Sequence, residues 1–83
     1  MPRFIDVHSE MKGLDQQTLA AAHQRDLELE TSEGVRFLHA WGDPTTGKVF
    51  CLSEGPSKEA VSRVHERAGH KADQIYEVPL EVE

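Results

Sequence analysis

The chain contains a single cysteine among its 83 residues. An internal disulfide is therefore impossible, and the sequence excludes the small secreted scaffolds that disulfides hold together. Long apolar runs are also absent, because no stretch approaches the ~20 residues that a helix needs to cross a bilayer. The first residues, 1–6, lack the apolar segment of a signal peptide. We therefore expect a cytoplasmic protein that does not bind a membrane.

Positive charge is scarce as well. Lys and Arg total 9 against 15 Asp and Glu, which gives a formal net charge of −6 with histidine neutral. Nucleic-acid phosphates select for Lys and Arg, so this balance argues against a nucleic-acid partner and suits a cation better. We expect one domain that covers residues 1–83. A chain this short buries only part of its apolar surface, so dimerisation would stabilise it. Five histidines are the unusual feature of the composition.

The most informative stretch that is present is a β-hairpin pattern at residues 35–54. Two strand-like runs, Val35–Trp41 and Lys48–Glu54, flank the turn-forming residues Gly42–Gly47. Strict alternation of side chains along the first run places His39 on the same face as Phe37. Apolar residues occur on both faces of the hairpin, which predicts helices over one face and a second subunit over the other.

The loop of this hairpin also matches the G-x-x-x-x-G-K spacing of a nucleotide-binding loop. Such a loop needs Ser or Thr after the Lys and a helix that follows it. Val49 stands there instead, at the start of a strand pattern, so we favour a simple turn.

The rest of the chain adds two strands and two helices. Asp15 and Ser57 are good N-cap residues, and Gly34 and Gly69 are natural helix stops. The expected segments are a strand at Arg3–His8, a helix at about 16–30, a helix from Ser57 to Gly69 and a strand at Asp73–Val82. The order strand, helix, strand, strand, helix, strand predicts an α+β, ferredoxin-like βαββαβ fold. In that fold an antiparallel sheet, with spatial strand order fourth, first, third, second, carries two helices on one face.

Two pairs of residues are candidates for metal binding. Asp6 and His8 are two residues apart and therefore lie on the same side of the first strand. They form either a solvent-facing polar edge or two ligands aimed in one direction. His23 falls near the centre of the apolar arc of the first helix, with Asp26 close enough to contact it. The pair is either a partly buried histidine held by Asp26 or a metal ligand with the residue that orients it.

The remaining histidines and the cysteine give weaker signals. His65 lies at the margin of the buried stripe of the second helix, and His70 follows the helix stop. Five residues correspond to 140° around a helix, so these two are not a natural chelating pair, and we expect His70 to interact with the helix C-terminus. Cys51 could supply a thiolate, although a small buried hydrophobic residue is the favoured interpretation.

Several segments resemble a family of small ferredoxin-like bacterial proteins, long labelled as a domain of unknown function, that includes a nickel-binding protein. The resemblance lies in FIDVH (residues 4–8), AHQRDL (22–27), GVRFLHAW (34–41), GKVFCLSE (47–54), VHERA (64–68) and ADQIYEV (72–78). It implies the fold described above and a homodimer. It also implies binding of Ni²⁺ through histidine and carboxylate groups, for metal sequestration, buffering or detoxification.

Imidazole and carboxylate ligands suit nickel, zinc and copper alike. We predict a divalent transition-metal binding protein, with Ni²⁺, Zn²⁺ or Cu²⁺ as the ion. The predicted ligands are Asp6, His8, His23, His39 and Glu54.

The alternative is a dimeric α/β-barrel enzyme, isomerase-like or monooxygenase-like, in which a His23–Asp26 pair transfers protons. The chain has no nucleophile motif or cofactor fingerprint, so a protein without catalytic activity is favoured. A third option is an interaction module whose apolar hairpin binds a partner protein.

Overall fold

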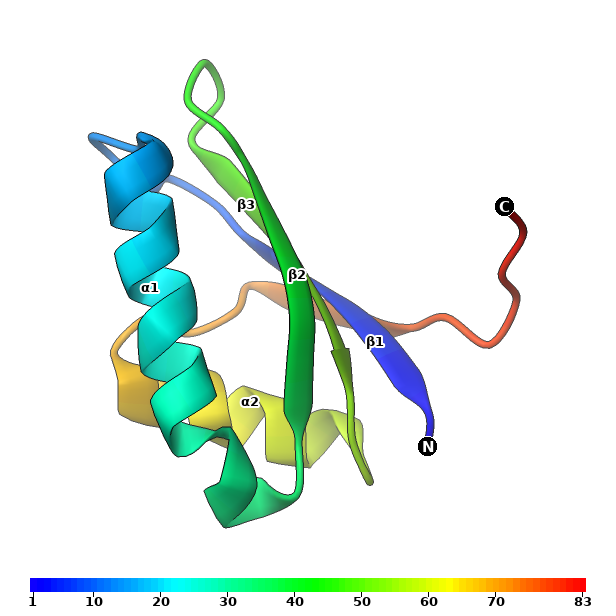
Figure 1. The fold of residues 1–83 in the computed structure, drawn as a ribbon. Coiled ribbons are helices and arrows are strands. Elements are labelled where there is room, and N and C mark those ends of the chain that lie inside the picture. The colour runs from blue at the N-terminus through cyan, green and yellow to red at the C-terminus, as the bar shows by residue number, and fades with distance from the viewer.

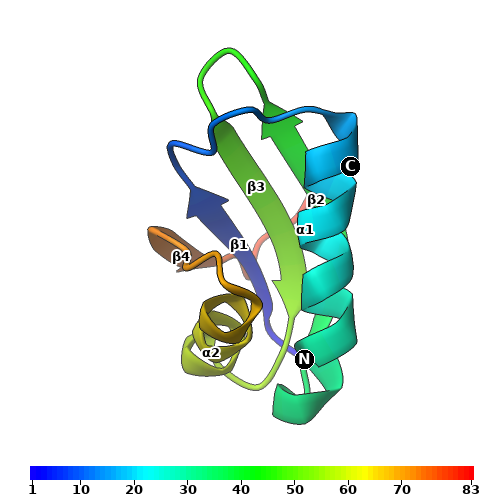
Figure 2. The same ribbon diagram turned by 90° about the vertical axis from the view of Figure 1, so that its left-hand side faces the viewer.

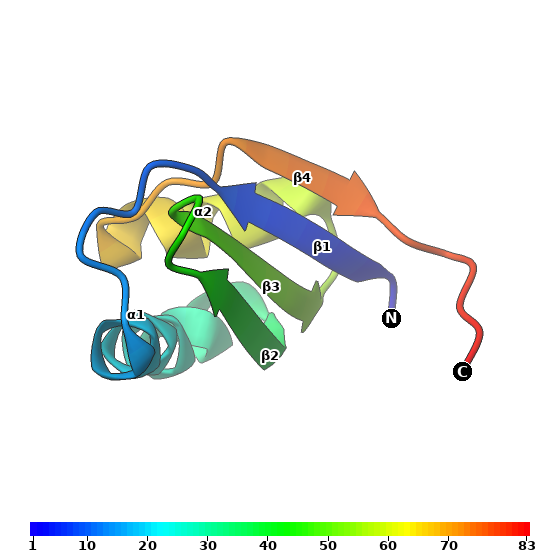
Figure 3. The ribbon, with the colours of Figure 1, turned by 90° about the horizontal axis from the view of Figure 1, so that it is seen from above.

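The computed structural model describes residues 1–83, and its four strands form a single antiparallel sheet in the order β2-β3-β1-β4. Both helices lie on the same side of this sheet (Figure 1 and Figure 3). The elements are β1 (Arg3–His8), α1 (Gln16–Leu29), the 3₁₀ turn η1 (Glu30–Glu33), β2 (Arg36–Asp43), β3 (Lys48–Glu54), α2 (Lys58–Ala68) and β4 (Gln74–Glu77). The predicted α+β fold and strand order are confirmed.

Both helices begin at the predicted capping residues. The Asp15 side chain accepts a 2.8 Å hydrogen bond from the Thr18 amide, and the Thr18 hydroxyl accepts one of 2.8 Å from the Asp15 amide, which completes a capping box. The Ser57 hydroxyl accepts a 3.1 Å bond from the Ala60 amide. Gly69 ends α2 in the left-handed region, with φ of 89°. In the resulting layer α1 lies beside β2 and α2 lies beside β4 (Figure 2).

Strand β2 carries an irregularity that simple alternation does not predict. Phe37 is opposite Ser53, but the register shifts after it, so that His39 is opposite Leu52. The extra residue of such a bulge reverses the alternation of side chains. Phe37 is therefore buried beneath the helices, whereas His39 is exposed on the other face of the sheet. The expectation that His39 and Phe37 share a face is wrong for this reason.

The last strand is shorter than predicted, because β4 ends at Glu77. Val78 still donates a 2.9 Å hydrogen bond to the Arg3 carbonyl, but Pro79 has no amide proton to continue the ladder. Residues 78–83 then extend away from the sheet (Figure 1).

The loop between β2 and β3 is a turn, as expected. The Gly47 amide donates a 2.8 Å hydrogen bond to the Asp43 carbonyl, and Gly47 has a φ of 74°. The segment that follows the loop is strand β3 and not a helix, so the chain lacks the loop-to-helix connection of a nucleotide-binding loop. Neither helix of the structure has the length and apolar character that crossing a membrane requires.

The apolar core lies between the sheet and α2. Its buried members are Phe4, Val35, Phe37, Ala60, Val61 and Val64. The other face of the sheet has no covering layer, and Trp41 and Tyr76 are about half exposed there, at 50% and 51%. Beside the apolar core, the helix-covered face also buries polar side chains, which is unusual for a chain of this size.

Candidate metal centre

Five polar side chains form a connected row between the sheet and the helices. They alternate imidazole and carboxylate in the order His8, Asp6, His65, Asp26 and His70. Strand β1 supplies the first two, α2 supplies His65, α1 supplies Asp26, and His70 follows α2. All are buried except His70, whose side chain is 14% exposed. The row therefore joins three elements in the interior and reaches the surface at one end.

His65 is the centre of the row. Its Nε2 donates a 2.8 Å hydrogen bond to Asp6 Oδ2, and its Nδ1 donates one of 3.0 Å to Asp26 Oδ1. Burial by itself lowers the pKa of His65, but the bonds to Asp26 and Asp6 outweigh burial and raise the pKa to about 9. Burial likewise would raise the pKa of both carboxyl groups, yet their hydrogen bonds with His65 hold each pKa below its usual range. In the metal-free protein, an imidazolium thus sits between two carboxylates.

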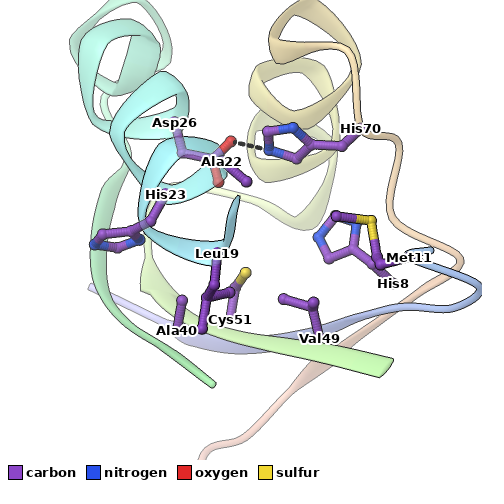
Figure 4. A pocket seen from close by; sticks show the side chains of 10 residues that line it. All are labelled: His8, Met11, Leu19, Ala22, His23, Asp26, Ala40, Val49, Cys51 and His70. Carbon is purple, nitrogen blue, oxygen red and sulfur yellow. Dashed lines mark hydrogen bonds and ion pairs between the residues drawn. The ribbon is translucent and has the colours of Figure 1, made fainter. Parts of the chain in front are cut away.

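His70 reaches the row because α2 ends early. Gly69 reverses the chain, and the His70 amide donates a 3.0 Å hydrogen bond to the His65 carbonyl. The His70 ring then returns toward α1, and its Nε2 lies 2.8 Å from Asp26 Oδ1 (Figure 4). The 140° separation assumed that the helix continues through His70, whereas it ends at Ala68. His65 and His70 therefore converge on one carboxylate, which sequence spacing did not predict.

The other end of the row contains two unsatisfied atoms. His8 Nε2 lies 2.9 Å from Asp6 Oδ1, but the two are not in hydrogen-bonding geometry, and neither atom has a hydrogen-bond partner. His8 Nδ1 lies 3.2 Å from the Lys71 carbonyl oxygen, which can only accept, so Nδ1 carries a proton. With Nδ1 directed at this carbonyl, Nε2 is the ring nitrogen that faces Asp6 and could act as a ligand. Buried polar atoms without partners are costly, so this pair indicates a place for an additional group.

The donor atoms fall into two groups, and within each group all atoms lie within 4.8 Å of one another. We name them the inner set (Asp6, His8, Cys51 and His65) and the outer set (Asp26, His65 and His70). Imidazole, carboxylate and thiolate donors suit the borderline divalent ions nickel, copper and zinc. The residues present therefore fit a transition-metal ion.

Cys51 is the least prepared of these donors. Burial raises the pKa of its thiol well above the usual range, and the negative charge of Asp6 raises it further. The metal-free thiol therefore keeps its proton. A cation bound beside it would favour the thiolate, which is the form that ligates.

A small cavity adjoins both sets (Figure 4). Its volume is about 10 Å³, which is room for one water-sized occupant. The residues that line it are His8, Met11, Leu19, Ala22, His23, Asp26, Ala40, Val49, Cys51 and His70. The space suits a single ion or water, whereas organic substrates occupy pockets of roughly 300 Å³ or more. The cavity therefore does not favour the small-molecule enzyme.

The predicted pair of His23 and Asp26 does not form. Asp26 bonds to His65 and His70, while the buried Nδ1 of His23 has no partner. Residues three apart on a helix differ by about 60° around its axis. That difference points Asp26 at α2, whereas the His23 ring is turned to the other side of the cavity in the view of Figure 4. The proton-transfer pair of the enzyme alternative is thus absent.

The other predicted ligands divide between the two faces of the sheet. Asp6 and His8 lie together on the helix-covered face, within the inner set. His39 lies on the open face and stacks on Trp41, with 5.6 Å between ring centroids. Glu54 also lies on that face, where its carboxylate is 3.3 Å from the guanidinium of Arg36. The sheet separates His39 and Glu54 from the buried row.

The sequence did contain signals for the residues that were missed. Phe4 shares a face of β1 with Asp6 and His8, and an apolar Phe4 at that position favours a buried face. His65 follows Val61 by four residues, a spacing that places both on one side of α2. The partners of Asp26 and His70 had no comparable local signal, because they come from different elements.

Comparison with known proteins identifies the family of this chain. Residues 4–78 match the family described as nickel responsive protein SCO4226-like. The crystal structure of SCO4226 from Streptomyces coelicolor A3(2) superposes with a TM-score of 0.94 at 59% sequence identity, over 96% of this chain and 99% of that chain. A comparison with curated proteins finds no match. On this evidence the chain belongs to the SCO4226-like family of nickel responsive proteins.

Proposed function

We propose that this protein binds a divalent transition-metal ion, with nickel as the physiological ion, and sequesters, buffers or detoxifies it in the cytoplasm. The observation that carries the proposal is the pair of unsatisfied buried atoms, His8 Nε2 and Asp6 Oδ1. A cation between them would satisfy both atoms at once. The family description supports nickel as the ion.

The inner set would hold this ion. It offers a carboxylate, two imidazoles and a thiol within 4.8 Å of one another. Binding requires His65 and Cys51 to give up the protons that face the ion, so affinity should rise with pH. His23 lines the adjoining cavity with an unpartnered Nδ1, and it is the nearest candidate for an additional ligand.

His39 and Glu54 would serve a separate, exposed ion on the open face of the sheet. This part of the proposal depends on a homodimer that forms through the open face. Apolar side chains on that face, including Trp41 and Tyr76, have no covering layer. A second copy of the chain would cover them and could complete the ligands of a surface ion. The ion of the inner set needs no partner subunit.

Isothermal titration of metal-stripped, tag-free protein with Ni²⁺, Zn²⁺ and Cu²⁺ tests the proposal. The informative variants are Asp6→Asn, His8→Ala and His39→Ala, and Glu66→Gln is the control because this exposed residue of α2 belongs to neither set. We expect saturable nickel binding by the wild-type protein, and the same binding by His39→Ala and Glu66→Gln. In Asp6→Asn and His8→Ala the affinity should fall by about 10-fold or more, which is the effect of removing a metal ligand or a residue that orients one. Circular dichroism confirms that each variant remains folded.

Two outcomes would overturn this assignment. Binding that survives in Asp6→Asn and His8→Ala but is lost in His39→Ala would move the ion to the open face. Absence of saturable binding by the wild-type protein would reject the metal function itself.

A further inference from the structure

The water-sized cavity beside Cys51 is lined on one side by a loop residue. Eight of its ten lining residues lie on β1, α1, β2 and β3, whose backbones are held by helix or sheet hydrogen bonds. The two exceptions are Met11, in the loop that joins β1 to α1, and His70 (Figure 4). These two residues are therefore the walls of the cavity that can move without unfolding a helix or a strand.

His70 is the better held of the two. Its amide donates a 3.0 Å hydrogen bond to the His65 carbonyl, and its ring nitrogen lies 2.8 Å from Asp26 Oδ1. Met11 is joined to the rest of the fold by one hydrogen bond, which its amide donates over 2.9 Å to the Gly47 carbonyl. Its flexible thioether has no strong hydrogen-bonding group to fix it in place. Met11 is therefore the wall that can open at the lowest cost.

The backbone around Met11 favours such an opening. Glu10 has a φ of 60°, in the left-handed region that residues other than glycine adopt at a cost in energy. Gly13, on the other side of Met11, has a φ of 70° and few steric restrictions. Met11 is half-buried, so a dissolved reagent can reach it, whereas Cys51 is 3% exposed. The loop residue thus lies between solvent and a protected thiol.

We propose that Met11 is an oxidisable lid, whose oxidation by a peroxide opens the cavity and exposes Cys51. A sulfur lone pair attacks one peroxide oxygen, an S–O bond forms and the O–O bond breaks. Sulfur is oxidised by two electrons, and the other oxygen takes the peroxide proton and leaves as water or an alcohol. The polar sulfoxide then fits poorly against the apolar lining residues Leu19, Ala22 and Val49, so the open loop is favoured. Such a lid would control access to the interior whether or not a metal ion binds there.

Labelling of Cys51 by a small maleimide, in the metal-free full chain before and after brief treatment with hydrogen peroxide, tests the lid. Peptide mass spectrometry measures both the oxidation of Met11 and the rate of labelling. We expect Met11 to be oxidised in the folded protein and labelling of Cys51 to become faster by roughly 10-fold or more, because local opening then limits the reaction less. Treatment with both methionine sulfoxide reductases should restore the slow rate.

Met11→Leu is the matched control, because leucine fills a similar volume and does not form a sulfoxide. This variant keeps Met1, which is 69% exposed, so any effect of oxidising Met1 remains in the control. Peroxide should leave its labelling rate unchanged. Met11→Gln places a polar amide at the lid and should speed labelling without peroxide. Lys12→Gln, at an exposed neighbour that does not line the cavity, should not.

Urea unfolding of each form separates local opening from a loss of global stability. The unfolding midpoint should be nearly the same before and after oxidation of Met11. Complete oxidation of Met11 without faster labelling of Cys51 would overturn the lid, as would resistance of Met11 to peroxide in the folded protein. An equal acceleration in Met11→Leu, or one that only follows a lower unfolding midpoint, would overturn it too.

Discussion

Asp26 and His65 are 39 residues apart in the sequence and are joined by a buried hydrogen bond of 3.0 Å. This contact links α1 to α2, and the second bond of His65 links α2 to Asp6 on β1. Without a metal ion, the row therefore holds the two helices against the sheet. With a metal ion, the same atoms would become ligands. Under the proposed function, the same side chains would therefore determine both the stability of the fold and the affinity for the metal ion.

Replacing Asp26 with asparagine should destabilise the metal-free protein by about 3 kcal/mol, because His65 would lose one of the carboxylates that compensate its buried charge. Urea unfolding at pH 6 measures the change. Glu28→Gln on the same helix is the control, since Glu28 is exposed and its ion pair with Arg25, at 3.7 Å, contributes under about 0.5 kcal/mol. Equal stability of the two variants would show that the Asp26 contact adds little.

The stability of the metal-free protein should fall as the pH rises from about 6.5 to 9. The folded state holds the pKa of His65 at about 9, whereas an unfolded histidine has a pKa of about 6.5. The contribution of His65 is therefore complete below pH 6.5 and lost as the pH passes 9, at a cost on the order of 3 kcal/mol. Urea unfolding at pH 6 and pH 9 tests this, and His65→Gln should flatten the difference. A protein more stable at pH 9 would contradict it.

At low pH the two buried carboxyl groups should make the stability of the folded protein fall as the pH decreases. The pKa values of Asp6 and Asp26 lie below the ordinary value of 3.8 in the folded state. Their contribution is present above about pH 3.8 and is lost as the pH falls through the folded pKa values. Unfolding followed by circular dichroism between pH 5 and pH 2 should show a cooperative acid transition. If Asp6→Asn and Asp26→Asn do not change its midpoint, these carboxyl groups do not cause it.

The Cys51 thiol should react slowly with a thiol reagent in the folded, metal-free protein. It is 3% exposed, and burial raises its pKa, so both access and thiolate formation are suppressed. We expect the rate of labelling at pH 8, measured by mass spectrometry, to be slower by roughly 100-fold or more in buffer than in urea, because a protected thiol reacts only when the structure opens. Rapid labelling of the folded protein would show that the inner set opens to solvent.

The Trp41→Glu substitution should dissociate the proposed homodimer. Trp41 is 50% exposed on the open face, where a charged side chain would oppose burial against a second copy. Analytical ultracentrifugation should show the mass of two chains for the wild-type protein and of one chain for the variant. Lys58→Glu, an exposed change on the opposite side of the molecule at the start of α2, is the charge control. A monomeric wild-type protein at all concentrations would reject the dimer.

Most of the fold was predictable because its signals are local. Asp15 and Ser57 cap the helices at the expected positions, and Gly69 ends α2. The hairpin turn and the element order then leave few possible arrangements, so the strand order followed from known topology. Strand β4 ended earlier than expected because Pro79 stops the ladder.

The sequence by itself determined which elements form and which residue types are available, because caps, turns and side-chain periodicity act over a few residues. Only the tertiary structure decided which side chains meet. The bulge after Phe37 turned His39 to the open face, and the reversal at Gly69 brought His70 back to Asp26. Asp26 faced His65 and not His23 because α1 packs against α2 in one particular rotation. These outcomes depend on contacts between distant segments, which local periodicity does not encode.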